Sequence, residues 1–367
     1  MISQAKKLIL FLSCVIFFLG LLSRDIRLQN FLVNYISDNE FKYRNLLCGE
    51  LTRCTRVGGE IFGLGLQNFS HLFAQLFYGN PLWQNFYLTE EQYFSIFNGF
   101  SSILFRTICL VPFAWYLSKL FKDNINAKIF SVLAITSMVS GFPLYYLNNL
   151  FGIYLVNYDY MVIFVIGLFI NFTNEILKSK ISLTLFTILC TVTLENLPLV
   201  LVIAVWFVNK DTFDRFTLLA VTGITSFVTY LVLLLGVILR NGAIMDMQSD
   251  GRFFSFNLPK LPEIFGAIFI LITWSFVLGI LVGGLGFRSL PKHSLKSVLD
   301  FIPVQSIKAI IMGYLISSFV GIFISILTEF ARQLIVLQFI VFVFGVAVGI
   351  KLLMGFEARR QLTKFAT

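Results

Sequence analysis

The sequence predicts an all-α, polytopic transmembrane helix bundle with about ten membrane segments, and three observations carry this prediction. Only 13% of the 367 residues are charged, whereas a soluble domain carries roughly 25%. Several apolar runs approach the ~20 residues that a helix needs to cross a bilayer. These runs are continuous, whereas the strands of a membrane barrel show ~10-residue segments that alternate in polarity. We therefore expect residues 1–367 to form a single transmembrane domain.

The predicted membrane segments follow the apolar runs in chain order. They are 8–23, 98–121, 129–148, 155–173, 181–194, 196–208, 216–239, 263–287, 307–328 and 333–355. Lys6 and Lys7 precede the first run, which therefore resembles a signal peptide. However, its apolar stretch is longer than usual for a signal peptide and no small-residue cleavage site follows it. We expect a retained first span with a cytoplasmic amino terminus.

The segment 181–208 can be interpreted as one helix or as a hairpin. One helix would be about 42 Å long, which is too long for a ~30 Å hydrocarbon core without strong tilt; each arm of a hairpin is too short to cross fully. The downstream charges favour a hairpin that turns near 195–198, because it places most Lys and Arg on the cytoplasmic side. Those inside would be Lys210, Arg215, Arg288, Lys292, Lys296, Lys308, Lys351, Arg359, Arg360 and Lys364, and those outside Arg240, Arg252, Lys260 and Arg332. Both termini are then expected in the cytoplasm.

The first external loop, 24–97, contains two amphipathic stretches. In 26–38, polar residues such as Arg27 and Asn34 share one helical face and apolar residues share the other, and 68–78 repeats the arrangement. Such helices suit the surface of a bilayer. The segment between them is polar and rich in turn residues.

Charge and cysteine content narrow the classes of function. The net charge of +9 is mainly information about membrane orientation, and no soluble segment carries a basic stripe with interleaved aromatic residues, so we expect no nucleic-acid partner. Cys48 and Cys54 share one loop and could pair in an oxidising compartment; two free thiols are the alternative. No Cys/His cluster has metal-ligand spacing.

Two charged sites stand out in the amino-terminal third. Asp25 lies between Arg24 and Arg27 at the outer end of the first span. It is either an interfacial charge or a general base, or a carboxylate that positions a metal. Arg106 lies about eight residues inside the second predicted span, where burial of a guanidinium costs at least ~2.5–3.5 kcal/mol. It either extends to the outer surface or faces a cavity, a partner or a lipid phosphate.

Three further carboxylates are candidates. Glu195 lies at the predicted hairpin turn, where a carboxylate within the membrane is a functional candidate; the alternative is a structural group that binds the free amides of the turn. Asp159 lies near the outer end of the fourth span beside Asn157 and Tyr158. This mixture suits sugar recognition or an ordinary interfacial belt. Glu60 could supply a second loop carboxylate.

The layout resembles the GT-C class, which comprises polytopic membrane glycosyltransferases that use lipid-phosphate-linked sugars. The resemblance rests on the Arg24-Asp25 pair after one span, the surface helix that follows, the long first external loop and the segment around Asn157 to Tyr160 before the hairpin. The class often has a paired acidic motif, whereas this chain has a lone Asp25.

The resemblance implies transfer of a sugar from a polyprenyl-phosphate donor to a saccharide, lipid or protein acceptor on the outer face of the cell membrane. Asp25 would deprotonate the acceptor hydroxyl, either directly or through a divalent metal. Basic residues would hold the departing lipid phosphate, and the polar groups of the fourth span and the hairpin would bind sugar. The substrate-binding residues would be Arg24, Arg106, Asp159, Glu195, Arg240 and Arg252. The alternatives are a transporter or flippase of lipid-linked saccharide, and a non-catalytic membrane subunit.

Overall fold

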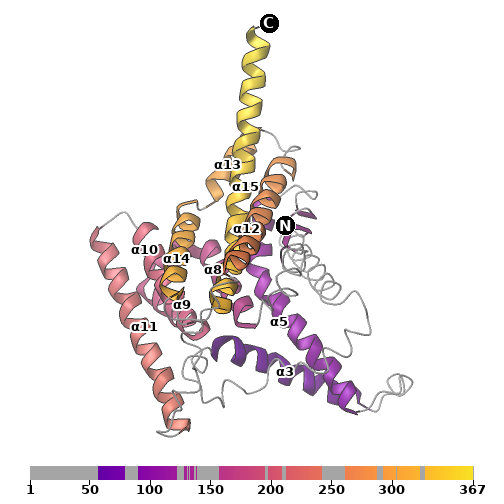
Figure 1. The fold of residues 1–367 in the computed structure, drawn as a ribbon, viewed down its shortest axis with the longest axis vertical. Coiled ribbons are helices and arrows are strands. Elements are labelled where there is room, and N and C mark those ends of the chain that lie inside the picture. The colour runs from indigo at the N-terminus through magenta and orange to yellow at the C-terminus, as the bar shows by residue number, and fades with distance from the viewer. Residues whose placement is uncertain are drawn as a thin grey trace.

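The structure is a bundle in which every secondary-structure element of the described residues is a helix (Figure 1). The computed structural model describes residues 57–78, 90–121, 128–129, 131, 133–135, 138, 157–194, 197–208, 212–241, 261–286, 292–302, 304–322 and 327–366. The helices are α3 (Val57–Phe77), α5 (Glu90–Leu120), α8 (Asn157–Lys178), α9 (Lys180–Thr193), α10 (Leu197–Val208), α11 (Thr212–Asn241), α12 (Leu261–Gly286), α13 (Lys292–Phe301), α14 (Val304–Ile322) and α15 (Leu327–Ala366).

Four helices of the described residues contain a segment that is long and apolar enough to cross a membrane. These segments are Asp159–Lys178, Arg215–Gly236, Ile268–Gly286 and Val336–Arg359. The shorter apolar helices are Leu104–Leu117, Lys180–Thr193 and Leu197–Phe207. The all-α prediction is therefore confirmed for the described residues, and four spans support a helical membrane protein. Most of the expected first span, 8–23, and of 129–148 lies outside the described residues.

Side-chain contacts give the directions of the central helices. Arg106 of α5 lies over the ring of Tyr160 in α8, and Lys119 lies over the ring of Phe172. Residue numbers rise together along both helices, so α5 and α8 run parallel. Ser179 alone separates α8 from α9 and caps the latter by accepting a hydrogen bond from a backbone amide of its first turn. A single-residue connection makes α9 return alongside α8 (Figure 1).

The break between α9 and α10 lies at Leu194. This residue has extended backbone, and α10 begins three residues later with Pro198 in its first turn, where proline lacks only an amide that the helix does not use. Phe186 of α9 and Ala204 of α10 line the same small apolar crevice. In one straight helix these two residues would lie about 27 Å apart. The two short helices therefore fold back on one another. Glu195 and Asn196 lie outside the described residues.

Glycine allows α12 and α15 to pack backbone against backbone. Gly279 and Gly283 in α12 face Gly345 and Gly349 in α15 in a parallel crossing. A methyl group at Gly283 would collide with the carbonyl oxygen of Val346. Both pairs have the small-xxx-small spacing that lets membrane helices approach closely. This seam joins the last two long apolar segments of the chain.

Two helices occupy regions where the sequence predicted only loops or a shorter element. α3 begins at Val57, inside the stretch expected to be turn-rich, and continues through the predicted 68–78 helix. It lies across the lower end of the bundle in Figure 1. At the opposite end α13 buries Leu295 and exposes Lys296, so it is amphipathic. The connections at both ends of the bundle therefore contain helices of their own.

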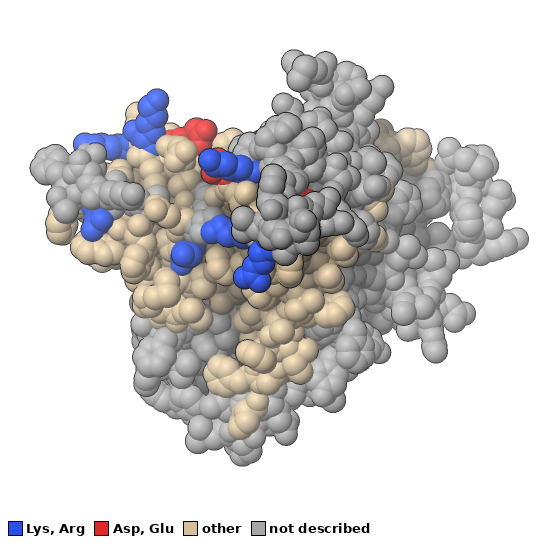
Figure 2. All heavy atoms as spheres, turned by 90° about the horizontal axis from the view of Figure 1, so that it is seen from above, with Lys and Arg blue, Asp and Glu red and all other residues tan. Residues whose placement is uncertain are grey.

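Most of the described Lys and Arg side chains gather at the end of the bundle opposite α3, and Arg106 is an exception. Several parts of the chain lie at this end (Figure 1): the carboxyl ends of the parallel helices α5 and α8, the α8–α9 and α10–α11 junctions, α13, and the carboxyl-terminal part of α15. Figure 2 views the molecule from this end and shows their charged side chains. This basic end carries Lys119, Lys178, Lys180, Arg215, Lys296, Lys308, Lys351 and Arg359.

The glycine seam predicts a position-specific effect of adding a single methyl group. Gly283→Ala should lower the free energy of unfolding by about 1–3 kcal/mol, because neighbouring backbone must move to admit the methyl. Gly223→Ala in α11 is the matched control, since nothing lies within 4 Å of the added carbon; it should be neutral or slightly stabilising. Unfolding of both variants in the same detergent checks this, and equal effects would contradict it.

Candidate functional site

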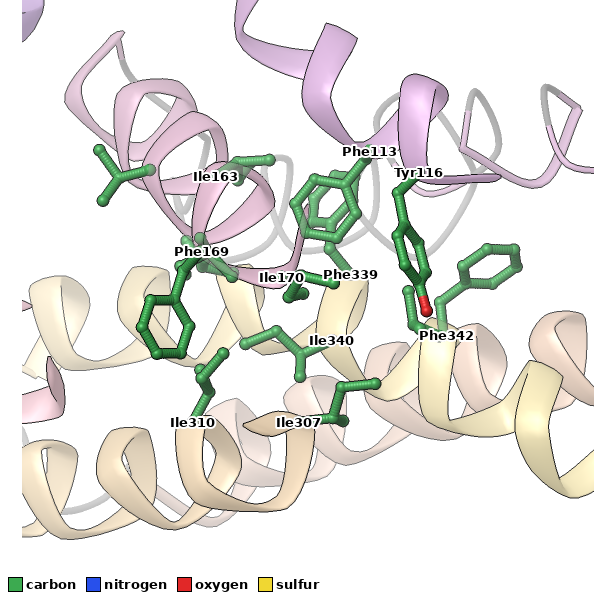
Figure 3. Close-up of a cluster of buried hydrophobic side chains, with 14 of the residues drawn as sticks. Phe113, Tyr116, Ile163, Phe169, Ile170, Ile307, Ile310, Phe339, Ile340 and Phe342 are labelled. Carbon is green, nitrogen blue, oxygen red and sulfur yellow. The ribbon is translucent and has the colours of Figure 1, made fainter. Parts of the chain in front are cut away.

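The interior of the bundle nearer the basic end is apolar. Phe113 of α5, Phe169 of α8, Ile310 of α14, and Phe339 and Phe342 of α15 converge there (Figure 3). The rings of Phe113 and Phe339 have centroids 5.4 Å apart. All these side chains are buried. This part of the core is mainly apolar, and the Tyr116 hydroxyl is one buried polar group within it (Figure 3).

The buried stripe of α14 changes character along the helix. Ile307, Ile310, Tyr314 and Ser317 follow at helical spacing and are all buried, with exposed fractions of 0%, 2%, 1% and 3%. Residues at this spacing share one face. The stripe is therefore apolar toward the basic end and polar toward the end where α3 lies. We call this half of the bundle, where Tyr314 and Ser317 are buried among mostly apolar side chains, the polar half.

Asp159 lies in this polar half, in the first turn of α8, and only 1% of its surface is exposed. The helix dipole favours a carboxylate at that position. The hydroxyl of Tyr314 lies within electrostatic range of the Asp159 carboxylate and of the Cys190 thiol. An interfacial-belt residue has its polar end in water, whereas the Asp159 side chain is buried within the protein. The structure instead joins α8, α9 and α14 around this carboxylate.

Arg106 reaches the same helix from α5. Its guanidinium carbon lies 5.3 Å from the ring centroid of Tyr160, the neighbour of Asp159. Such a cation–π contact stabilises the charge by ~0.5–2 kcal/mol, depending on solvation. Phe105 beside it is fully buried, so Arg106 enters the bundle with its helix. The two sequence-predicted residues that the structure describes in full, Arg106 and Asp159, are thus brought to one region.

Three buried side chains in or next to this half have polar atoms without a hydrogen-bond partner. They are the Tyr314 hydroxyl, the Ser317 hydroxyl and both polar atoms of the Gln338 amide in α15, a residue with 0% exposure. An unsatisfied buried group costs about 1–3 kcal/mol. Ser275 of α12 shows the usual solution, since its hydroxyl donates to the carbonyl oxygen of Leu271 one turn earlier. The carbonyl oxygen of the Asn171 amide, toward the basic end of α8, is in the same state, so such atoms are not confined to one half of the bundle.

The amino-terminal half of α3 closes the site from below. An added carbon at Gly58 would touch Val192, near the end of α9, at 3.0 Å. The rings of Phe62 and Phe105 have centroids 5.6 Å apart. α3 thus lies against the end of the hairpin and beside Arg106, whereas Phe69 and other large apolar side chains of this helix are exposed. This arrangement suits a helix lying in a membrane surface.

The remaining predicted site residues cannot be placed in this geometry. Arg24, Asp25, Glu195 and Arg252 lie outside the described residues, as do the surface helix 26–38 and the Cys48–Cys54 pair. Arg240 belongs to the last turn of α11, and its side chain lies outside the described set. Within the described ranges no three His, Cys, Asp or Glu residues gather closely enough to hold a metal ion.

Sequence analysis missed Tyr314, Ser317 and Gln338. A signal was present, because Tyr314 and Ser317 interrupt one apolar run three residues apart and Gln338 interrupts another. Such residues can contribute to a site only if they lie on the buried face of their helix, and the sequence does not show which face is buried. The groups that the structure brings together are the Asp159 carboxylate and the Arg106 guanidinium, which lies over the ring of Tyr160. A guanidinium can bind a phosphate, and a carboxylate can accept hydrogen bonds from hydroxyl groups.

The two halves of the α14 stripe should differ in access to water. In a cysteine-free background, a cysteine at Ser317 should react with a small water-soluble maleimide, and one at Ile307 should not, because apolar side chains surround Ile307. Both positions lie on one face of one helix, so each serves as a control for the other. Labelling of both positions at the same rate would contradict the two-part interior.

Comparison with other proteins assigns no family to this chain. No protein-family model matches it, and no curated protein or solved structure matches it either. Its function is therefore argued from its own residues.

Proposed function

We propose that this chain is an integral membrane glycosyltransferase of the GT-C type, which moves a sugar from a polyprenyl-phosphate-linked donor to an acceptor on the extracytoplasmic face. One observation carries the proposal: the buried carboxylate of Asp159 lies at the start of α8, away from the basic end, and Arg106 lies beside it over the ring of Tyr160. A transferase that takes its substrates from one side needs a one-sided site.

The orientation follows from the positive-inside rule. Because most of the described Lys and Arg side chains gather at one end, that end is placed in the cytoplasm, and α3 lies at the outer surface. Four of the ten proposed segments correspond to helices long and apolar enough to cross a membrane, and the other six remain part of the proposal. Both termini are cytoplasmic in this arrangement, and the protein resides in the cell membrane.

The proposed reaction is an inverting displacement at the anomeric carbon of the donor sugar. Asp25 deprotonates the acceptor hydroxyl, directly or beside a divalent metal, and such base catalysis contributes ~10²–10⁴-fold. Arg106 holds the departing lipid phosphate by charge-assisted hydrogen bonds, and Arg24, Arg240 and Arg252 are further candidates for this role. The acceptor is a saccharide, a lipid or a protein.

A flippase for lipid-linked saccharides is the second candidate, and the helix break at Leu194 favours it. Transporters commonly place their binding sites at interrupted helices near the midplane. A flippase must also open a route through the apolar half of the bundle. Access of thiol reagents to an engineered cysteine near Glu195 separates the two: labelling from both faces favours transport, and labelling from outside alone favours the transferase.

Sugar transfer by the purified protein tests the proposal directly. In lipid nanodiscs with a polyprenyl-phosphate-linked sugar, the wild-type chain should transfer sugar to an added acceptor, and Asp25→Asn should reduce the rate by at least ~10²-fold. The variant must match the wild type in yield and unfolding temperature. Transfer by Asp25→Asn at the wild-type rate would show that another group is the base.

Arg106 has a matched control in Arg215, whose guanidinium carbon lies 4.8 Å from the Trp206 ring centroid at the basic end. Arg106→Met should lower transfer by about 10²-fold, since the phosphate loses a charged donor, and Arg106→Lys should lose less because the charge remains. Arg215→Met should leave transfer unchanged. Equal losses at both arginines would indicate a general effect on folding.

A further inference from the structure

We propose that the basic end of the bundle binds an anionic phospholipid beside α5 and α8, with the Lys119 ammonium as the contact to its headgroup phosphate. This inference goes beyond the proposed function and does not depend on it. Lys119 lies thirteen residues after Arg106 on α5, which is about 20 Å by helix rise. The lipid site is therefore separate from the proposed site of sugar transfer.

Two aromatic rings hold the end of the Lys119 side chain. Its ammonium nitrogen lies 5.3 Å from the ring centroid of Trp115, one turn earlier on α5, and 5.3 Å from that of Phe172 on α8. The faces of such rings attract a cation, so they keep the ammonium between the two helices. Both rings are partly at the surface, with exposed fractions of 41% and 37%. In a helix bundle surrounded by lipid, this arrangement places a positive charge at the lipid boundary.

The described residues supply no acidic partner for this charge. Among them, no carboxylate forms an ion pair with Lys119, Lys178 or Lys180, and Glu175 on the same part of α8 is exposed. Lys178 ends α8 and Lys180 begins α9, so the three lysines lie close to one helix junction. In Figure 2 blue basic side chains predominate over red acidic ones at this end. A cation beside lipid needs an anion close by, and a lipid phosphate can supply it.

A second cluster of aromatic and basic side chains lies at the α10–α11 connection. The guanidinium carbon of Arg215 lies 4.8 Å from the ring centroid of Trp206, and that ring meets Phe216 edge-on with centroids 6.0 Å apart. Trp206 lies two residues before the end of α10, as Trp115 lies five before the end of α5. Tryptophan is enriched at the headgroup level of a bilayer. We therefore expect the Lys119 ammonium at the depth of the lipid phosphates.

The apolar surface beside these lysines favours a lipid over a soluble anion. Directly after Lys180, α9 leaves the basic end with Ile181 and Leu185 exposed by 74% and 63%. These side chains and the rings of Trp115 and Phe172 can contact acyl chains, whereas inorganic phosphate would gain nothing from them. The three lysines favour a lipid of net negative charge, such as phosphatidylglycerol. In phosphatidylcholine the choline group already neutralises the phosphate.

Quenching of Trp115 fluorescence by brominated lipids tests the proposal. Replacement of Trp83, Trp206 and Trp274 by Phe leaves Trp115 as the one tryptophan of the chain. The full chain is placed in phosphatidylcholine nanodiscs with a minor fraction of brominated phosphatidylglycerol or, at the same fraction, brominated phosphatidylcholine. We expect the anionic lipid to quench more strongly, with a relative affinity of at least about fivefold. This preference should fall at high salt, because exposed charges are then screened.

Lys308 provides a matched control, because it lies near the start of α14 at the same end, is exposed, and contacts no aromatic ring of the described residues. Lys119→Gln should lower the relative affinity by about fivefold, which corresponds to the loss of one basic residue near the membrane surface. Lys308→Gln removes the same charge and should leave the preference nearly unchanged. Lys119→Arg should retain it, since the charge remains.

The remaining outcomes decide against the proposal. Equal losses in Lys119→Gln and Lys308→Gln would show a diffuse attraction to the whole basic end. Equal quenching of the wild-type Trp115 by the two brominated lipids would show that no anionic lipid is preferred. If inorganic phosphate abolishes the preference when it replaces chloride at equal ionic strength, the lysines bind free phosphate. Because the measurement reports lipid binding alone, a failure of sugar transfer would leave its result unchanged.

Discussion

The structure depends on one constraint, which is that polar groups buried among apolar helices must find partners within the protein. Most buried hydroxyls of the described helices meet it locally by donating to the carbonyl oxygen four residues earlier. Examples are Thr173, Thr187, Thr191, Thr222 and Ser275. Because this solution is so regular, the side chains that do not follow it carry information. Tyr314, Ser317 and Gln338 are such exceptions, since their buried polar atoms make no hydrogen bond.

The same absence of water changes what holds the helices together. Between helices surrounded by lipid the hydrophobic effect contributes little, so close van der Waals contact matters more. The facing glycines of α12 and α15 provide this contact by bringing backbone to backbone. α11 shows the opposite case, since most of its apolar segment is covered by no other part of the bundle. One rigid seam and one peripheral helix are thus built from equally apolar sequences, and only the placement of small residues distinguishes them.

The features that depend on local chemistry could be predicted from the sequence alone. The interruption between two short apolar runs was predicted near 195–198, and α9 ends just before it; the long apolar runs correspond to helices. The sequence alone was not enough for what packing decides. For Asp159 the sequence left both sugar recognition and an interfacial belt open, because a charge near the end of an apolar run gives the same pattern whether the side chain faces water or the core. α13 and the start of α3 were not predicted because their polar residues resemble those of loops. These segments form helices because one face of each is buried against a neighbouring helix, and the sequence alone does not show that neighbour.

The distribution of polarity along α14 is the strongest link between fold and function. A bundle that only anchored a partner would have no reason to keep unsatisfied hydroxyls inside, since replacing them by apolar side chains would remove a cost. A conduit would need polar groups along its whole length, yet Ile307 and Ile310 continue the same face as apolar core. α3 lies at the end of the bundle toward which α14 becomes polar, and it exposes large apolar side chains such as Phe69 (Figure 1). A ligand with a lipid tail could therefore keep its tail in the membrane beside α3 while its polar head contacts this end of the bundle.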